Sequence, residues 1–587
     1  MSFGEMMSAF SGFVWSTPTA LLLTGAGLLF TIMTLGIQWK ALTHGLKVIR
    51  GDYDDPEVEG NISHFQALCA ALSATIGLGN IAGVAVAVAA GGPGAVFWMW
   101  VVGFLGMATK FTTCSLATMF RKRDSFGEYR GGPMYFIELG LGRNSTTPGM
   151  RALAKTLAVA FAVLGMCASV GAGNMFQANQ VAEIFVNLFH SQVPGGIHAD
   201  VQLMIKIGIG IVICILAGLV MIGGITRIGN VASKLVPSMC ILYVAGSLVV
   251  IVAHLDQVPA MFVAIFEDAF SFSASQGAFL GVAVKSAIIH GVRRACFSNE
   301  AGLGSAPIAH ATAKTNEPIR EGVVAATGPF VDTIVICTMT ALVILITDAH
   351  VREPVGSIAS YLPAPDGGSA EVHVLWTDAG QVKKGDSLLI KIPTEDERLF
   401  TGRQLDVADV VDGNVVVEIK YSPDAQGLAL RESDARHLSP ATAVYLDRVG
   451  VNMTAFAFDR GFPGVPFGTY FIPIAALFFA FSTIISWGFY GETCTEYLFG
   501  ERAVLPFKFI YVGMIVVGTA SRYLQPVLDW SDGMLGLMLV PNLIGTILLA
   551  PVVMRETKRY FTRLKNGEFD EDVRRIAEAK RRRNGAR

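Results

Sequence analysis

Long apolar segments separated by short polar connections make up most of the chain. A helix that crosses a bilayer needs about 20 mostly apolar residues, and eleven segments meet this requirement. They lie near residues 17–39, 66–90, 95–120, 154–188, 203–222, 230–254, 276–312, 322–348, 468–494, 507–524 and 532–554. The pattern predicts an all-α polytopic membrane protein with about eleven transmembrane helices.

One long segment, residues 352–450, interrupts the apolar pattern. It is polar and charged, and it contains runs in which apolar and polar residues alternate, at 370–376, 387–392 and 414–419. Alternation with a period of two, broken by glycine and aspartate, is typical of short strands. We therefore expect a small β-rich insertion on the extracytoplasmic side, between the eighth and ninth spans.

The distribution of Lys and Arg predicts the orientation, because cytoplasmic loops retain basic residues. The stretch 121–155, from the end of the third span to the start of the fourth, holds seven of them, whereas 189–202 and 255–275 hold none. We expect a cytoplasmic C-terminus, an N-terminus outside and a location in the cell (inner) membrane. The expected parts are an N-terminal helix with a cytoplasmic loop (1–64), a membrane core in two pieces (65–348 and 451–554), the insertion (352–450) and a basic cytoplasmic tail (555–587).

Composition excludes several classes of protein. Of the 587 residues, 52% are hydrophobic and 16% charged, well below the roughly 25% charge of soluble domains. The net charge of −2 argues against a nucleic-acid partner. The eight cysteines show no C-x-x-C spacing, so we expect neither disulfides nor a zinc site. Hydrolase motifs and the phosphate-binding G-x-x-x-x-G-K-[ST] are absent, so we expect no enzymatic activity. We also expect a monomer in the lipid bilayer, without a cofactor.

Two of the predicted spans contain glycine clusters at membrane depth. The second has three glycines within the seven residues 77–83, and the seventh has a polar, glycine-rich run at 296–307. Unwound backbone is tolerated in a bilayer only where it lines a protein-buried cavity, and there its N–H groups and carbonyls can bind ions. Close helix packing is the alternative. Two breaks five spans apart favour a transporter built as a 5+5 inverted repeat.

Several short motifs resemble those of one transporter family. They are the runs 76–80, 79–84, 91–100, 131–135, 297–302 and 490–492. On these runs the chain resembles the alanine or glycine:cation symporter family, the sodium:alanine symporters, with the leucine-transporter-type fold of the amino acid-polyamine-cation superfamily. The resemblance covers almost all of the hydrophobic chain, and only the insertion departs from it.

The resemblance implies a secondary active transporter. Such a protein carries a small neutral amino acid, alanine or glycine, into the cell together with sodium by alternating access. Sodium is then the coupling ion. An amino-acid-sensing receptor that uses the same core with the extracytoplasmic domain is the alternative, and uptake under a sodium gradient separates the two.

A zwitterionic substrate needs donors for its carboxylate, acceptors for its ammonium group and a shaped cavity. Backbone amides of the unwound second span would supply the donors, as in the transporters that the chain resembles. Asn299 and nearby carbonyls would supply the acceptors. Trp487 would shorten the pocket, unless it only packs. Asn174 either adds a contact or bonds to a neighbouring helix. The expected substrate-binding residues are Thr75, Gly77, Leu78, Gly79, Gln177, Asn299, Gly302 and Trp487.

A hard cation requires oxygen ligands, and the ninth span presents two neighbouring hydroxyls beside the carbonyl of Ala480. By resemblance these hydroxyls meet carbonyls of the second span and hold one sodium ion. Hydrogen bonds to the preceding helical turn are the alternative. The expected ligands are Ser73, Ile76, Ala480, Ser482 and Thr483, and by resemblance a second, substrate-adjacent cation site comprises Thr75, Asn80 and Ser298.

Ionisable residues within a membrane are costly and usually functional. Arg293 and Arg294 precede the second break, and Glu300 lies six to seven residues further on. An ion pair across the break is therefore feasible. Asp332 either completes the second cation site or neutralises an arginine, and we favour neutralisation.

Overall fold

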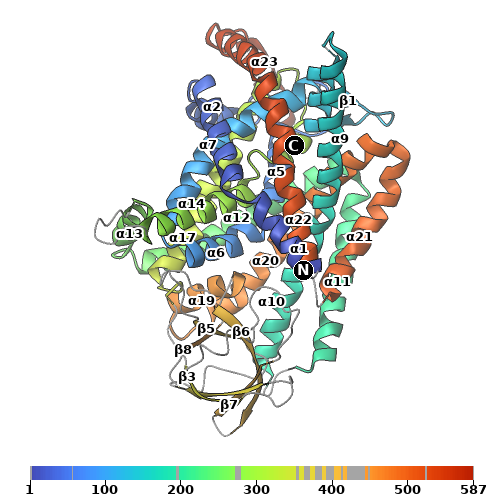
Figure 1. Ribbon diagram of the computed structural model, residues 1–587. Coiled ribbons are helices and arrows are strands. Elements are labelled where there is room, and N and C mark those ends of the chain that lie inside the picture. The colour runs from blue at the N-terminus through green and yellow to red at the C-terminus, as the bar shows by residue number, and fades with distance from the viewer. Residues whose placement is uncertain are drawn as a thin grey trace.

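The computed structural model describes the chain except residues 1–2, 56, 144, 194–196, 271–278, 352–355, 363–369, 377–386, 392–401, 412–413, 420–442, 447–449, 522–524 and 586–587. Long helices pack side by side, and a small group of strands lies at one end of them (Figure 1). In the described part, nine helices are long and apolar enough to cross a membrane, and a bent pair adds a tenth. The chain is thus a polytopic membrane protein, as the apolar pattern predicted.

The helical elements follow one another with short connections. Those of the first half are α1 (Phe3–Val14), α2 (Thr17–Met33), α3 (Ile37–Lys40), η1 (Ala41–Gly45), α4 (Leu46–Ile49), α5 (His64–Thr75), η2 (Gly79–Gly83), α6 (Val84–Gly91), α7 (Gly94–Met119), α8 (Pro133–Phe136), η3 (Ile137–Arg143), α9 (Pro148–Val170), η4 (Gly171–Met175), α10 (Phe176–Gln192), α11 (Ala199–Met221), α12 (Gly224–Ala253) and α13 (Val258–Phe270). Those of the second half are α14 (Phe279–Asn299), α15 (Ala306–His310), α16 (Pro318–Pro329), η5 (Phe330–Cys337), α17 (Thr338–Ile346), α19 (Val451–Gly461), α20 (Phe467–Phe499), η8 (Glu501–Ala503), α21 (Val504–Ala520), α22 (Gln525–Leu537), α23 (Leu539–Lys565) and α24 (Asp570–Gly585).

Two predicted spans differ from the observed helices. The first membrane-length helix runs over Met6–Met33, so it begins earlier than the predicted segment 17–39. Its first part, α1, packs against α22, a contact that a local hydropathy pattern does not reveal. The predicted span 276–312 falls on α14 and α15, which a non-helical segment separates.

The first broken helix begins with a capping box and bends at its glycines. The Ser63 hydroxyl accepts from the Gln66 N–H, and the Gln66 side chain accepts from the Ser63 N–H, which satisfies donors at the start of α5. The helix stops at Ile76, whose ψ is 87°, and resumes in the π-helical turn η2 and in α6. The two halves are bent by 53°. A side chain does not fit at Gly77, because a Cβ there would lie 2.7 Å from Thr483 Oγ1.

The second break follows Asn299, the last residue of α14. Glu300, Gly302 and Gly304 have φ values of 54°, 95° and 89°, the left-handed region in which a helix ends. A Cβ on Gly304 would lie 2.7 Å from Pro133 Cγ. The glycine-rich sequence therefore permits a turn and a close approach at the same point.

Two long helices enclose both breaks. Helix α7 packs against α2, α14 and α16, and α20 packs against α5, α9, α10 and α12. The segments of the two breaks are buried among them. This packing places the unwound backbone inside protein, where a bilayer protein tolerates it.

The strands form two separate groups. A hairpin of β1 (Lys122–Arg123) and β2 (Tyr129–Arg130) follows α7. Six antiparallel strands within residues 352–450 form a closed barrel in the order β3-β4-β7-β6-β5-β8, and the predicted runs correspond to β4, β5 and β7. The barrel lies beyond α19, at the end of the helices opposite to β1 (Figure 1). The strands are β3 (Gly356–Leu362), β4 (Ala370–Trp376), β5 (Ser387–Lys391), β6 (Gly402–Val411), β7 (Asn414–Ile419) and β8 (Ala443–Leu446).

Candidate substrate and cation site

A cavity of about 610 Å³ lies between the two broken helices. Its walls come from the first break, the start of α10, the end of α14, the middle of α20, and α22. The predicted substrate-binding residues in its lining are Thr75, Gly77, Leu78, Gly79, Gln177 and Trp487. Asn299 and Gly302 are not in that lining. The structure therefore brings most of the predicted substrate site to one place.

The unwound backbone of the first break forms a hydrogen bond with a side chain of the same segment. The Gly77 N–H donates to Asn80 Oδ1 at 3.0 Å, so this amide has a partner, unlike the open donor expected from the sequence. Gln177 Oε1 lies 3.8 Å from a β-carbon built on Gly77, and it is buried without a hydrogen-bond partner in the described structure. Buried polar atoms are normally satisfied. A ligand that donates an N–H within the cavity would satisfy this one.

Asn299 and Asn174, two other amides considered from the sequence, stabilise the protein itself. Asn299 Oδ1 accepts from the Ala301 N–H at 2.9 Å, and its Nδ2 donates to Thr333 Oγ1 at 3.0 Å. These bonds fix the second break, because a helix end leaves backbone groups unpaired. Asn174 Nδ2 donates to the Tyr511 carbonyl at 2.5 Å, which is a bond between helices.

Hydroxyl and carbonyl oxygens of α5 and α20 converge beside the cavity. The Ser73 carbonyl lies 3.3 Å from Ser482 Oγ and 3.2 Å from Thr483 Oγ1. Both hydroxyls also lie within 3.0 Å of the Phe479 carbonyl, so bonding to the preceding turn occurs as well. The carbonyl beside them is that of Phe479 and not of Ala480 as expected, because a helical carbonyl faces side chains three and four residues later.

These oxygens are of the type that a hard cation takes as ligands. Each hydroxyl carries one proton but lies near two carbonyl acceptors. Four oxygen atoms therefore lie close together: the Ser73 carbonyl of α5, and the Phe479 carbonyl and the two hydroxyls of α20. A hard cation among them would use oxygen ligands that are already assembled.

Asp332, Asn80 and Ser298 form a second buried cluster. Asp332 Oδ1 accepts from Asn80 Nδ2 at 2.6 Å, and Oδ2 accepts from Ser298 Oγ at 2.6 Å and from Thr333 Oγ1 at 2.9 Å. The favoured expectation that Asp332 neutralises an arginine is wrong, since its described partners are these three groups. Thr75, which was grouped with Asn80 and Ser298, instead donates to the Leu72 carbonyl at 3.2 Å.

The predicted pair between Glu300 and the arginines is also wrong for the described structure. Trp487 Nε1 donates to Glu300 Oε1 at 3.0 Å, and Ser305 Oγ donates to Oε2 at 2.5 Å. Arg293 pairs with Asp532 of α22 at 3.7 Å, while Arg294 lines the cavity. Glu300 has a left-handed backbone conformation, and its carboxylate bonds to Trp487 of α20 although Glu300 and Arg294 both line the cavity.

Sequence reasoning missed three contributors: Phe479, Thr333 and Asp532. The rule that hydroxyls bond to the carbonyl three or four residues earlier would have indicated Phe479. Asp532 is an acidic residue in an apolar segment, the same signal that singled out Asp332. Thr333 has no distinguishing signal, because threonines are common in the spans.

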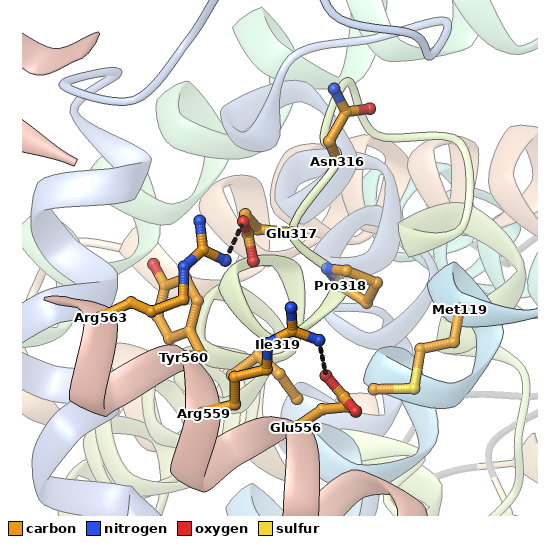
Figure 2. A pocket seen from close by; sticks show the side chains of 9 residues that line it. All are labelled: Met119, Asn316, Glu317, Pro318, Ile319, Glu556, Arg559, Tyr560 and Arg563. Carbon is orange, nitrogen blue, oxygen red and sulfur yellow. Dashed lines mark hydrogen bonds and ion pairs between the residues drawn. The ribbon is translucent and has the colours of Figure 1, made fainter. Parts of the chain in front are cut away.

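A second cavity, of about 380 Å³, lies between the start of α16 and α23. Figure 2 shows that its charged side chains lie in pairs, Arg563 with Glu317 at 2.7 Å and Arg559 with Glu556 at 3.7 Å. Paired and partly exposed charges contribute little binding energy for a ligand. The ion pair between Arg563 and Glu317 links α23 to the start of α16. We do not place the substrate in this cavity.

The cavity between two broken helices agrees with the comparison to known families. A sequence model of the sodium:alanine symporter family matches residues 1–362 and 439–574. The chain belongs to the sodium:alanine symporter family. Cation-coupled amino acid transport is therefore the general activity of this multi-pass membrane protein. The unmatched residues are 363–438, within the insertion, and 575–587, at the end of the basic tail.

Transport proteins of other organisms match this chain over nearly their full length. The sodium/alanine symporter AgcS of Methanococcus maripaludis is 36% identical, over 95% of this chain and 98% of AgcS. A transporter of Haemophilus influenzae is 35% identical, over 97% of this chain and 99% of its own. The transporter YflA of Bacillus subtilis is 32% identical, over 94% of this chain and 92% of YflA.

Proposed function

We propose that this symporter carries a small neutral amino acid, alanine or glycine, into the cell together with sodium. The observation that carries the proposal is the cavity between the breaks, with the oxygens of Ser73, Ser482 and Thr483 beside it. An amino acid and a cation then occupy adjacent sites that share the first break. Binding of either would order the backbone that the other needs, which is a physical basis for coupling.

The substrate would use groups from both sides of the cavity. Its carboxylate would lie against the amides of Leu78 and Gly79, and its ammonium group would donate to the unpartnered Gln177 Oε1. The Gln177 contact replaces the role that the sequence suggested for Asn299. Trp487, held by Glu300, would form the wall against the substrate side chain.

We infer further that the core is a 5+5 inverted repeat of the leucine-transporter type, with the barrel outside the cell. Support comes from the breaks, which occur five predicted spans apart and border one cavity. Relative motion of the halves of α5–α6 and α14–α15 would open the cavity to either side in turn. Ser73, Thr483 and Phe479 would hold sodium in the state that is open to the outside.

Uptake into proteoliposomes tests the proposed function. Purified protein is reconstituted, and labelled alanine or glycine is added outside with an inward sodium gradient or an equal potassium gradient. We expect accumulation with sodium that decays when the gradient is dissipated by an ionophore. Binding of alanine without accumulation would contradict transport and favour a receptor.

Replacing Trp487 tests the wall of the cavity. Trp487→Ala should allow leucine to compete with alanine uptake at a concentration about tenfold lower than in the wild type. Room for one more methylene group in an apolar pocket changes the discrimination between two substrates by about this factor or more. Trp487→Phe keeps most of the bulk but loses the N–H that Glu300 accepts. We expect Trp487→Phe to retain the preference for alanine. An unchanged competition profile for Trp487→Ala would remove Trp487 from the substrate site.

A further inference from the structure

Three buried ionisable side chains lie outside the substrate and cation sites. His64 is the first residue of α5, His310 the last of α15, and Glu321 lies in the first turn of α16. Glu321 Oε1 accepts from His310 Nδ1 at 2.5 Å, and Oε2 accepts from His64 Nδ1. All three are at most 1% exposed. We call them the His–Glu–His clasp.

The clasp joins one half of each broken helix. Next to it, the segments that precede α5 and follow α15 pair through a parallel bridge between Ile62 and Ala313. The Asn61 N–H donates to the Thr312 carbonyl and the Lys314 N–H to the Ile62 carbonyl, both at 2.8 Å. Arg121, which follows α7, donates to backbone carbonyls on both sides of the bridge, those of Glu59, Ala311, Ala313 and Thr315.

Charge balance inside the clasp requires a proton. A carboxylate accepts from both imidazoles, so each Nδ1 carries hydrogen. With two neutral imidazoles the cluster carries one buried negative charge, which is costly when it lacks an opposite charge. One additional proton makes an imidazolium and balances the carboxylate.

The neighbouring titratable groups do not replace that proton. Cys114 of α7 and Arg121, which follows α7, lie within electrostatic range of Glu321. The Arg121 guanidinium donates its hydrogen bonds to four carbonyls and none to Glu321, so its charge acts on the carboxylate only from a distance. The imidazoles of α5 and α15 are the only groups among the described residues that donate side-chain hydrogen bonds to Glu321.

We propose that the His–Glu–His clasp is a proton-binding site whose proton holds this end of the bundle closed. Loss of the proton leaves an unbalanced charge in a dry site, and separation of α5 and α15 from α16 admits water that solvates it. Opening of the two half-helices is thereby linked to proton release. We assign this end as the cytoplasmic gate, an assignment that rests on the proposed transport function, whereas the proton linkage does not.

Hydrogen exchange on the full-length protein tests this linkage without any substrate. The protein in lipid discs is exchanged from about pH 5.5 to about pH 8.5, and protection factors are obtained for the bridge amides of Asn61, Lys314 and Thr315. If opening releases one proton, protection should fall by about tenfold per pH unit between the pKa of the clasp in the open state and its higher pKa in the closed state, and should level off above that range. A wild-type protection factor that is independent of pH would overturn the proposal.

Variants locate the proton. Glu321→Gln keeps one acceptor and one donor between the histidines without a charge, so the pH dependence should disappear. The double variant His64→Gln with His310→Gln, which removes both imidazoles, should do the same if Glu321→Gln does not fold. His44→Gln is the matched control, because His44 is also buried but bonds to Tyr560 at 2.8 Å; its pH dependence should equal that of the wild type. A slope that persists in the clasp variants would overturn the proposal.

Discussion

Replacing Thr483 by alanine is expected to raise the sodium concentration for half-maximal alanine uptake by about 10- to 100-fold, because a hydrogen-bonding group that contacts a charge contributes about 1.5–3 kcal/mol. Thr483 Oγ1 lies beside the Ser73 and Phe479 carbonyls, so its removal takes one oxygen from the proposed sodium site. The alanine affinity at saturating sodium should change much less. Sodium titrations of uptake in proteoliposomes measure both quantities.

Thr493→Ala is the control for this substitution. Thr493 lies on the same helix, is buried, and donates to the Phe489 carbonyl at 3.0 Å. It loses a hydroxyl that bonds only within its own helix, so the sodium dependence should not change. Equal sodium dependence in Thr483→Ala and the wild type would show that the Thr483 hydroxyl only bonds to the preceding turn.

Asp332→Asn is expected to reduce sodium-driven uptake by at least about 100-fold at physiological sodium, since a charged acceptor of three hydrogen bonds is lost in a fully buried site. In the wild type, Asn80 and Ser298 each donate a hydrogen bond to the Asp332 carboxylate. In the variant, the NH2 group of the new asparagine side chain faces one of these two donors, and no hydrogen bond forms there. If Asp332 completes a second cation site, the sodium dependence of the residual uptake should also become less steep. Uptake at a series of sodium concentrations gives both results.

Two comparisons separate this effect from misfolding. Thr333→Val removes one of the three donors to Asp332 and should produce a smaller loss in the same direction. Asp459→Asn is the matched control, because Asp459 also accepts from two donors, the Thr469 N–H at 3.1 Å and hydroxyl at 2.6 Å. It lies outside the cavity lining, so transport should be retained. Wild-type transport by Asp332→Asn would exclude Asp332 from ion coupling.

The sequence predicted the elements of the site better than their contacts. Apolar segments of membrane length and glycine clusters are local signals, and they located the spans and both breaks. The positions of Gly77, Gln177, Thr483 and Trp487 around one cavity follow from these breaks and from a family resemblance. The hydrogen-bond partners of these side chains do not follow from either signal.

The charged residues illustrate the difference. Glu300 and the arginines are near one another in the sequence, yet Glu300 bonds to Trp487 of α20, 187 residues away. Asp332 bonds to Asn80, 252 residues away. Both outcomes depend on how helices from the two halves of the chain pack, which a pattern within one helix does not contain.

The amino-acid sequence alone determined that this protein lies in a membrane and where its helices break, because hydrophobic length and the conformational freedom of glycine act within a few residues. Only the tertiary structure decided which oxygens face one another, which carboxylate receives which donor, and that two histidines from separate broken helices share Glu321. These contacts require side chains from distant segments to meet in a dry interior, where most buried polar groups bond to a partner.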